Sequence, residues 1–161
     1  MMKFLKTVQL DISDQKALPK AAFPGEWAVT GTFAFADVDA EQMDNKQQLA
    51  FRNGWLGVGS FGRATFVQVV SINEQETDDV IRALGDHLNQ HYGAPDLSAA
   101  LEAARMEVSD AQGLCDHPLG TLLSITRELT TEGITERIHV VAKTDDEQHA
   151  RIWTVEQDEA V

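Results

Sequence analysis

The fold is decided by residues 73–115, whose sequence is NEQETDDVIRALGDHLNQHYGAPDLSAALEAARMEVSDAQGLC. In its first half an apolar side chain recurs at every fourth position, namely at Val80, Leu84, Leu88 and Tyr92. This spacing places these side chains on one face of a helix. Gly93 and Pro95 then end the helix, because glycine adopts positive φ readily and proline has no amide hydrogen to donate. We therefore predict a helix over residues 74–92.

A second helix follows Asp96, whose carboxylate can cap the first turn. Its apolar positions are separated by alternating steps of four and three residues: Leu97, Leu101, Ala104, Val108, Ala111 and Cys115. Such a repeat forms one continuous apolar seam. The seam must pack against a neighbour, most simply the preceding helix or a sheet.

The segments on both sides of this helical pair carry the alternation typical of β-strands. Residues 27–35, WAVTGTFAF, place Trp27, Val29, Gly31, Phe33 and Phe35 on one face. The other predicted strands are residues 3–10, 63–72, 121–129 and 134–142. Residues 13–25 are predicted as a loop and residues 45–53 as a short helix with Leu49 inward. The fold class is α+β, with a mostly antiparallel sheet of about five or six strands and two main helices packed on one face.

A single domain over residues 1–161 is expected, because domains usually have about 100–200 residues. Residues 144–161 are acidic and are expected to form a flexible tail. Within this tail, Ile152, Trp153 and Val155 indicate a short edge strand. An exposed edge of this kind leaves a homo-oligomer open as an alternative.

The charge of the chain excludes some partners. It has 26 acidic and 13 basic side chains, a net charge of −13, so we expect no nucleic-acid partner.

No apolar run approaches the roughly 18 residues of a spanning helix, so we expect no membrane segment. A single cysteine permits no internal disulfide and agrees with a reducing compartment. The expected location is cytoplasmic.

Residues 57–62, GVGSFG, match the spacing of a dinucleotide-binding glycine loop. A strand follows the loop where that motif requires a helix, so the motif is not supported. Trp55 and Phe61 flank permissive backbone at Gly57 and Gly59, which makes this loop the candidate for binding a ligand or a protein partner. The alternative is that both aromatic side chains anchor the loop to the core.

A second group of residues suggests a metal. His87 and His91 are four residues apart on the first helix, and Cys115, Asp116 and His117 follow the second helix. If these side chains converged, they could bind a divalent metal. The alternative is that His87 and His91 are ordinary helix residues and that Cys115 to His117 end a helix and form a turn.

Four segments resemble a small bacterial protein family of unknown function. They are MKFLKTVQLD (2–11), PGEWAVTGTFAFAD (24–37), FRNGWLGVGSFG (51–62) and LCDHPLGTL (114–122). The resemblance spans nearly the whole chain. It implies no activity, cofactor or catalytic residue, and it implies an accessory role beside metal-dependent redox enzymes and their maturation factors.

The leading hypothesis is a non-enzymatic accessory or interaction protein with a protein partner, because no catalytic set is recognisable in the chain. No catalytic residue and no cofactor are predicted. The alternative is a metal-binding or small-ligand-binding domain that uses His87, His91, Cys115, Asp116 and His117.

Overall fold

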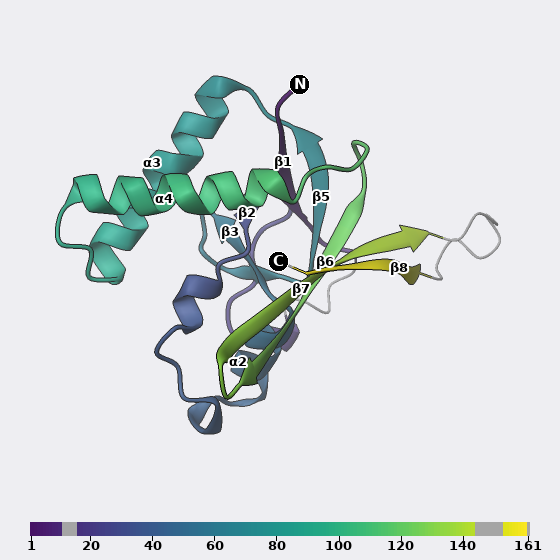
Figure 1. Cartoon of the computed structure of the whole chain (residues 1–161), viewed down its shortest axis with the longest axis horizontal. Helices are drawn as coiled ribbons and strands as arrows, with labels where there is room; N and C mark the ends of the chain where they lie inside the picture. Colours follow the sequence, from purple (N-terminus) through teal and green to yellow (C-terminus); the bar gives the residue numbers. More distant parts are fainter. Residues whose placement is uncertain (11–15, 144–152, 161) are drawn as a thin grey trace.

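The computed structural model describes residues 1–10, 16–143 and 153–160. Its strands form an antiparallel sheet in the order β4-β3-β2-β1-β5-β6-β7-β8 (Figure 1). The strands are β1 (Lys3–Val8), β2 (Trp27–Val29), β3 (Trp55–Val58), β4 (Arg63–Ala64), β5 (Phe66–Ser71), β6 (Leu122–Thr130), β7 (Gly133–Lys143) and β8 (Trp153–Ala160). The α+β class is confirmed, but the sheet has eight strands rather than five or six. The difference arises because residues 55–58 are a strand and because Thr65 separates β4 from β5.

Three α-helices accompany the sheet: α2 (Asn45–Asn53), α3 (Glu74–His91) and α4 (Leu97–Gly113). Each begins at a side-chain cap, as the sequence indicated for α4. At α3 the Asn73 side chain accepts a hydrogen bond from the Glu76 amide at 2.7 Å, and the Glu76 side chain accepts one from the Asn73 amide at 3.0 Å. The helices α3 and α4 pack against each other and contact β3, β1 and β2 (Figure 1).

The predicted strand over residues 27–35 ends early. β2 stops at Val29, Gly31 takes φ of 72°, and Thr32–Phe35 form the 3-10 helix η1. A Cβ atom at Gly31 would lie 2.4 Å from Leu56 Cβ, so the chain approaches β3 more closely here than any other residue type permits. The single aromatic face expected for this segment is therefore wrong. A further 3-10 turn, η2 (Ala40–Gln42), leads to α2.

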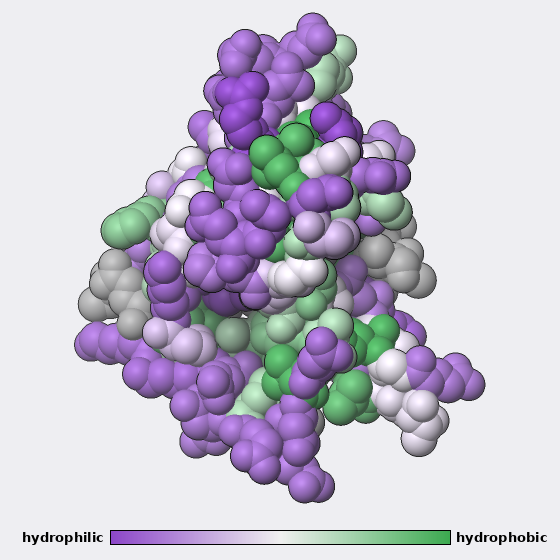
Figure 2. Space-filling model, turned by 90° about the vertical axis from the view of Figure 1, so that its left-hand side faces the viewer, coloured by the Kyte–Doolittle hydropathy of each residue, from purple (hydrophilic) through white to green (hydrophobic). Residues whose placement is uncertain are grey.

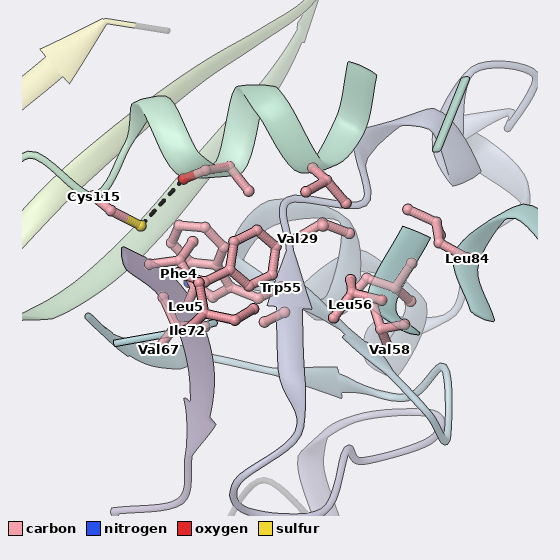
Figure 3. Packing of buried hydrophobic residues seen from close by; sticks show 14 of the residues in the cluster. Phe4, Leu5, Val29, Trp55, Leu56, Val58, Val67, Ile72, Leu84 and Cys115 are labelled. Atoms are coloured by element: carbon pink, nitrogen blue, oxygen red, sulfur yellow. Dashed lines mark hydrogen bonds between the residues drawn. The ribbon is translucent and has the colours of Figure 1, made fainter. Parts of the chain in front are cut away.

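The core lies where α4 and α3 cover the sheet (Figure 3). Phe4 and Leu5 of β1 and Val67 of β5 are fully buried there together with Leu84 of α3. In α2, Ala50 and Phe51 are the buried residues, and Leu49 is half-buried rather than fully inward.

The acidic segment 144–161 is described in part. β8 pairs antiparallel with β7, in agreement with the predicted last strand. Residues 144–152, which belong to the expected flexible tail, lie outside the described residues. Among the described helices, none is both long and apolar enough to cross a membrane.

Candidate ligand-binding groove

A cavity of about 580 Å³ opens at the surface between α2, η1 and the C-terminal half of α3. Figure 2 shows hydrophobic side chains around a hollow on the face that includes the turn from α3 to α4. Its aromatic walls are Phe35 from η1, Phe61 from the β3–β4 loop, and Tyr92 at the end of α3. Of the fourteen described residues that line it, two are Lys or Arg, two are His and none is Asp or Glu. We call this cavity the groove.

Phe61 and His87 form the closest ring contact in the groove. Their rings stack with centroids 3.7 Å apart and planes inclined by 2°. The backbone of Phe61 has φ of 58°, a conformation that residues other than glycine rarely adopt. The two candidate sites suggested by the sequence therefore meet here, since one contributed Phe61 and the other contributed His87.

The rings of His87, His91 and Tyr92 lie close together at the end of α3. The ring centroid of His87 lies 4.9 Å from that of His91 and 5.5 Å from that of Tyr92. Burial lowers the pKa of His87, and the neighbouring His91 and Lys20 lower it further. These effects favour the neutral form of the His87 ring.

The glycine loop is shaped by a carboxylate of the same chain. Glu26 accepts hydrogen bonds from the Ser60 amide at 2.6 Å, the Ser60 hydroxyl at 2.8 Å and the Phe23 amide at 2.5 Å. A Cβ atom at Gly59 would lie 2.8 Å from Glu26 Oε1, and one at Gly57 would lie 3.1 Å from it. Gly57 and Gly59 thus make room for Glu26, and their expected role in binding a ligand stays a prediction.

Trp55 does not line the groove. Its side chain is 0% exposed and packs in the core, as do the other residues of β3 (Figure 3). The expected role of Trp55 at a binding surface is therefore wrong, and the alternative of an aromatic anchor describes it. Phe61, six residues later, is the aromatic side chain of this segment that reaches the groove.

Cys115, Asp116 and His117 lie at the end of α4, where the helix stops. The Cys115 thiol is buried and donates a hydrogen bond to the Ala111 carbonyl at 3.3 Å (Figure 3). Burial raises the pKa of Cys115 to about 12, so the thiol stays protonated at neutral pH. The main chain continues as a turn, with the His117 amide bonded to the Cys115 carbonyl.

The five residues of the metal hypothesis do not converge. His87 and His91 line the groove, whereas Cys115 and Asp116 line a separate cavity beside the N-terminus. Within the described part of the chain, no group of three or more His, Cys, Asp or Glu side chains is placed to hold a metal ion. The prediction of one metal site that uses all five residues is therefore wrong.

Two buried arginines beneath the groove escaped the sequence analysis. Arg127 of β6 donates to the carbonyls of Phe51 at 2.8 Å and Gly54 at 2.9 Å, at the C-terminal end of α2. It also donates to the Thr30 carbonyl at 2.5 Å and pairs with Glu136 at 3.3 Å. The signal was present, because Arg127 follows the buried Leu123 and Ile125 at alternate positions on the inward face of β6.

Arg63 lies next to Arg127 and faces the groove. It donates to the carbonyls of Thr30, Gly31 and Gly54 at 3.3, 3.0 and 3.2 Å. Its guanidinium carbon lies 4.5 Å from the ring centroid of Phe35. Burial, and secondarily the charge of Arg127, lowers the pKa of Arg63 to about 9, so the side chain remains charged at pH 7.

The fold and the groove define an α+β domain with a surface cavity of ligand size. The chain belongs to a family of unknown function, DUF6505, which it matches over residues 2–158. Comparison with curated proteins gave no significant match, and neither did comparison with solved structures.

Proposed function

We propose that the protein binds a small organic molecule with an aromatic or other planar ring in the groove. The observation that carries this proposal is the aromatic lining of a cavity of about 580 Å³. Cavities that hold small organic ligands usually measure about 300–1,000 Å³ and have apolar walls with a few polar groups. Phe35 and Phe61 are half-buried and Tyr92 is exposed, so part of each ring surface is available for contact.

The proposal is binding without turnover. The described residues that line the groove include no Ser, Thr, Cys, Asp or Glu, so its Lys, His and Tyr side chains have no carboxylate in the lining to orient or activate them. His87 is stacked on Phe61, an arrangement that suits a flat binding wall. A metal at His87 and His91 is less favoured, because proteins usually supply three or four ligands to a zinc ion.

Three roles expected from the sequence and from the family resemblance stay predictions. A protein partner, a cytoplasmic location and a place in redox-enzyme maturation are compatible with ligand binding, and none is needed for it. A binding protein without turnover would itself be an accessory protein.

Titration with N-phenyl-1-naphthylamine, a neutral aromatic dye that fluoresces in apolar sites, tests this proposal. We expect saturable binding of one dye per chain. The variant Phe61→Ala should weaken binding about tenfold, because it removes one aromatic wall. Phe23→Ala removes a phenylalanine that is 70% exposed and does not line the groove, and it should bind like the wild type.

Far-ultraviolet circular dichroism of both variants separates lost binding from lost folding. If the dye binds without saturation, or if folded Phe61→Ala binds it as tightly as the wild type, the groove is not the binding site and the proposal fails.

A further inference from the structure

The groove differs in charge from the rest of the molecule. The chain has twice as many acidic as basic side chains, 26 against 13. Yet the described lining residues include Lys20 and Arg63 and no carboxylate. A cavity lined by groups of one sign concentrates ligands of the opposite sign. The groove is thus a positive site on a negative protein.

We propose that the ligand of the groove is an anion, a ring-bearing molecule that carries one carboxylate or phosphate group. This inference rests on the proposed function and specifies the chemistry of its ligand. The rings of Phe61, His87 and Phe35 would contact the planar body, and the charged group would face Lys20 and His91.

The two buried arginines, Arg63 and Arg127, differ in their hydrogen-bond partners, and this difference supports the assignment. Arg127 has a carboxylate partner, Glu136, at 3.3 Å. Arg63 lines the groove, and its hydrogen bonds within the described part of the chain go to main-chain carbonyls. Carbonyl dipoles solvate a guanidinium but leave its net charge unbalanced. An anion in the groove would supply the opposite charge that Arg63 lacks.

The side chains of Lys20 and His91, at the opening of the groove, can reorient toward such a ligand. Lys20 and His91 are both exposed, while His87 is half-buried between them and Phe61. A Lys ammonium donates up to three hydrogen bonds, and a histidine ring donates at least one. Both can therefore orient toward a carboxylate or phosphate without rearrangement of the sheet.

The histidines also predict how binding depends on pH. The titratable groups that face His87 across the groove are Lys20, Arg63, His91 and Tyr92. The positive charges of His91 and Lys20 hold the pKa of His87 below its usual range, after the larger effect of burial. A bound anion offsets these charges and favours protonation of His87. The affinity for an anion should therefore rise as the pH falls from 8 to 6, while that for a neutral ligand should not.

The test compares two dyes with the same aromatic framework. 8-Anilinonaphthalene-1-sulfonate carries one negative charge, and N-phenyl-1-naphthylamine carries none. We expect the sulfonate to bind about tenfold more tightly, the ratio that one hydrogen bond to a charged group supplies. Lys20→Met and His91→Gln should each lower this preference, measured as the ratio of the two dissociation constants, about threefold. Lys46→Met removes the same charge from an exposed lysine that does not line the groove, and it should keep the full preference.

The outcomes separate this inference from the proposed function. If neither dye binds with saturation, the proposed function and this inference both fail. If both dyes bind equally, or if Lys20→Met and His91→Gln retain the preference, the groove is a ligand site but its ligand is not selected by negative charge. If instead the sulfonate is preferred and both variants lower the preference, displacement of the sulfonate by benzoate and by phenyl phosphate distinguishes a carboxylate ligand from a phosphate ligand. Displacement by neither at saturating concentration overturns the inference.

Discussion

At the scale of single residues, Arg127 links parts of the chain that are distant in sequence. Its guanidinium bonds to the end of α2 and to the Thr30 carbonyl, and it pairs with Glu136 of β7. Thr32 also donates a hydrogen bond to Glu136, so η1 joins the same network. A positive charge at the C-terminal end of a helix is favourable as well, because the helix dipole is negative there.

Arg127→Met should therefore lower the free energy of unfolding by about 3–5 kcal/mol, the usual effect of removing one partner from a buried ion pair. The carbonyls of Phe51 and Gly54 would lose donors, and Glu136 would lose its partner. Urea unfolding measures the change. Arg105→Met, at an exposed position of α4, is the control and should change stability by less than about 0.5 kcal/mol. Equal stability of the two variants would contradict the role of Arg127.

Glu107 of α4 makes stability depend on pH. Burial, then the negative charges of Asp110 and Glu136, raises the pKa of Glu107 to about 7 from its ordinary value of 4.5. Because the folded-state pKa is the higher one, the folded protein holds this proton more tightly than the unfolded chain does. Ionisation of Glu107 therefore costs stability, which falls as the pH rises from about 4.5 through 7.

Glu107→Gln should remove this cost. At pH 8 the variant should be more stable than the wild type by about 1–2 kcal/mol, which is less than the full pKa shift would give because solvent screens the partly exposed side chain. At pH 4 the two proteins should be equally stable. Glu102→Gln, at an exposed position of the same helix, keeps Glu107 and should gain no such stability at pH 8. A Glu107→Gln variant that gains nothing at pH 8 would refute this account.

At the scale of elements, the parts with local signals could be predicted and the parts set by distant contacts could not. α3 and α4 were predicted because their apolar spacing is regular and because Asp96 caps α4. The strands β6 and β7 were predicted from two alternating segments, residues 121–129 and 134–142, and they pair with each other. The end of β2 was missed, because Gly31 turns there to fit against Leu56 and Arg63, both of which are far along the chain.

Gly31→Ala tests this turn. The substitution places a side chain at φ of 72° and only 2.4 Å from Leu56 Cβ, so we expect a loss of more than about 2 kcal/mol of stability. Gly25→Ala is a matched control, because Gly25 has φ of 82° with no atom within 4 Å of the added Cβ. It should lose about 1 kcal/mol, the cost of the backbone conformation alone. Thermal or urea unfolding of both variants measures the difference, and similar losses would show that close packing at Gly31 is unimportant.

At the scale of the whole molecule, the candidate site depends on how the strands are ordered. Phe61 and His87 were both identified from the sequence, but in separate hypotheses. They meet because the β3–β4 loop lies against the C-terminal half of α3, which no local pattern encodes. Trp55 was misplaced for a related reason, since a glycine-rich segment resembles a loop until its pairing with β2 is known. The cations of the groove come from separate segments, so their charge was hidden within an acidic chain.

The net charge of −13 should make the protein more stable in salt. Salt screens repulsion between exposed charges, with a Debye length of about 8 Å at physiological ionic strength. Raising sodium chloride from 20 to 300 mM should increase Tm by about 2–4 °C. A variant that combines Asp86→Asn with Glu102→Gln, at two exposed acidic positions, should show a smaller increase. A constant or falling Tm would mean that self-repulsion does not limit stability.

The arginine network also determines how the molecule opens. Arg127 belongs to the β6–β7 hairpin and donates hydrogen bonds to carbonyls at the end of α2. Neither element can therefore separate from the other without breaking hydrogen bonds of this buried guanidinium. The helix α2 and the hairpin should therefore form one cooperative unit in native-state hydrogen exchange, with amide protons that exchange at a common free energy of opening. In Arg127→Met the two elements should exchange independently, and α2, which is short, should become the first helix to lose protection.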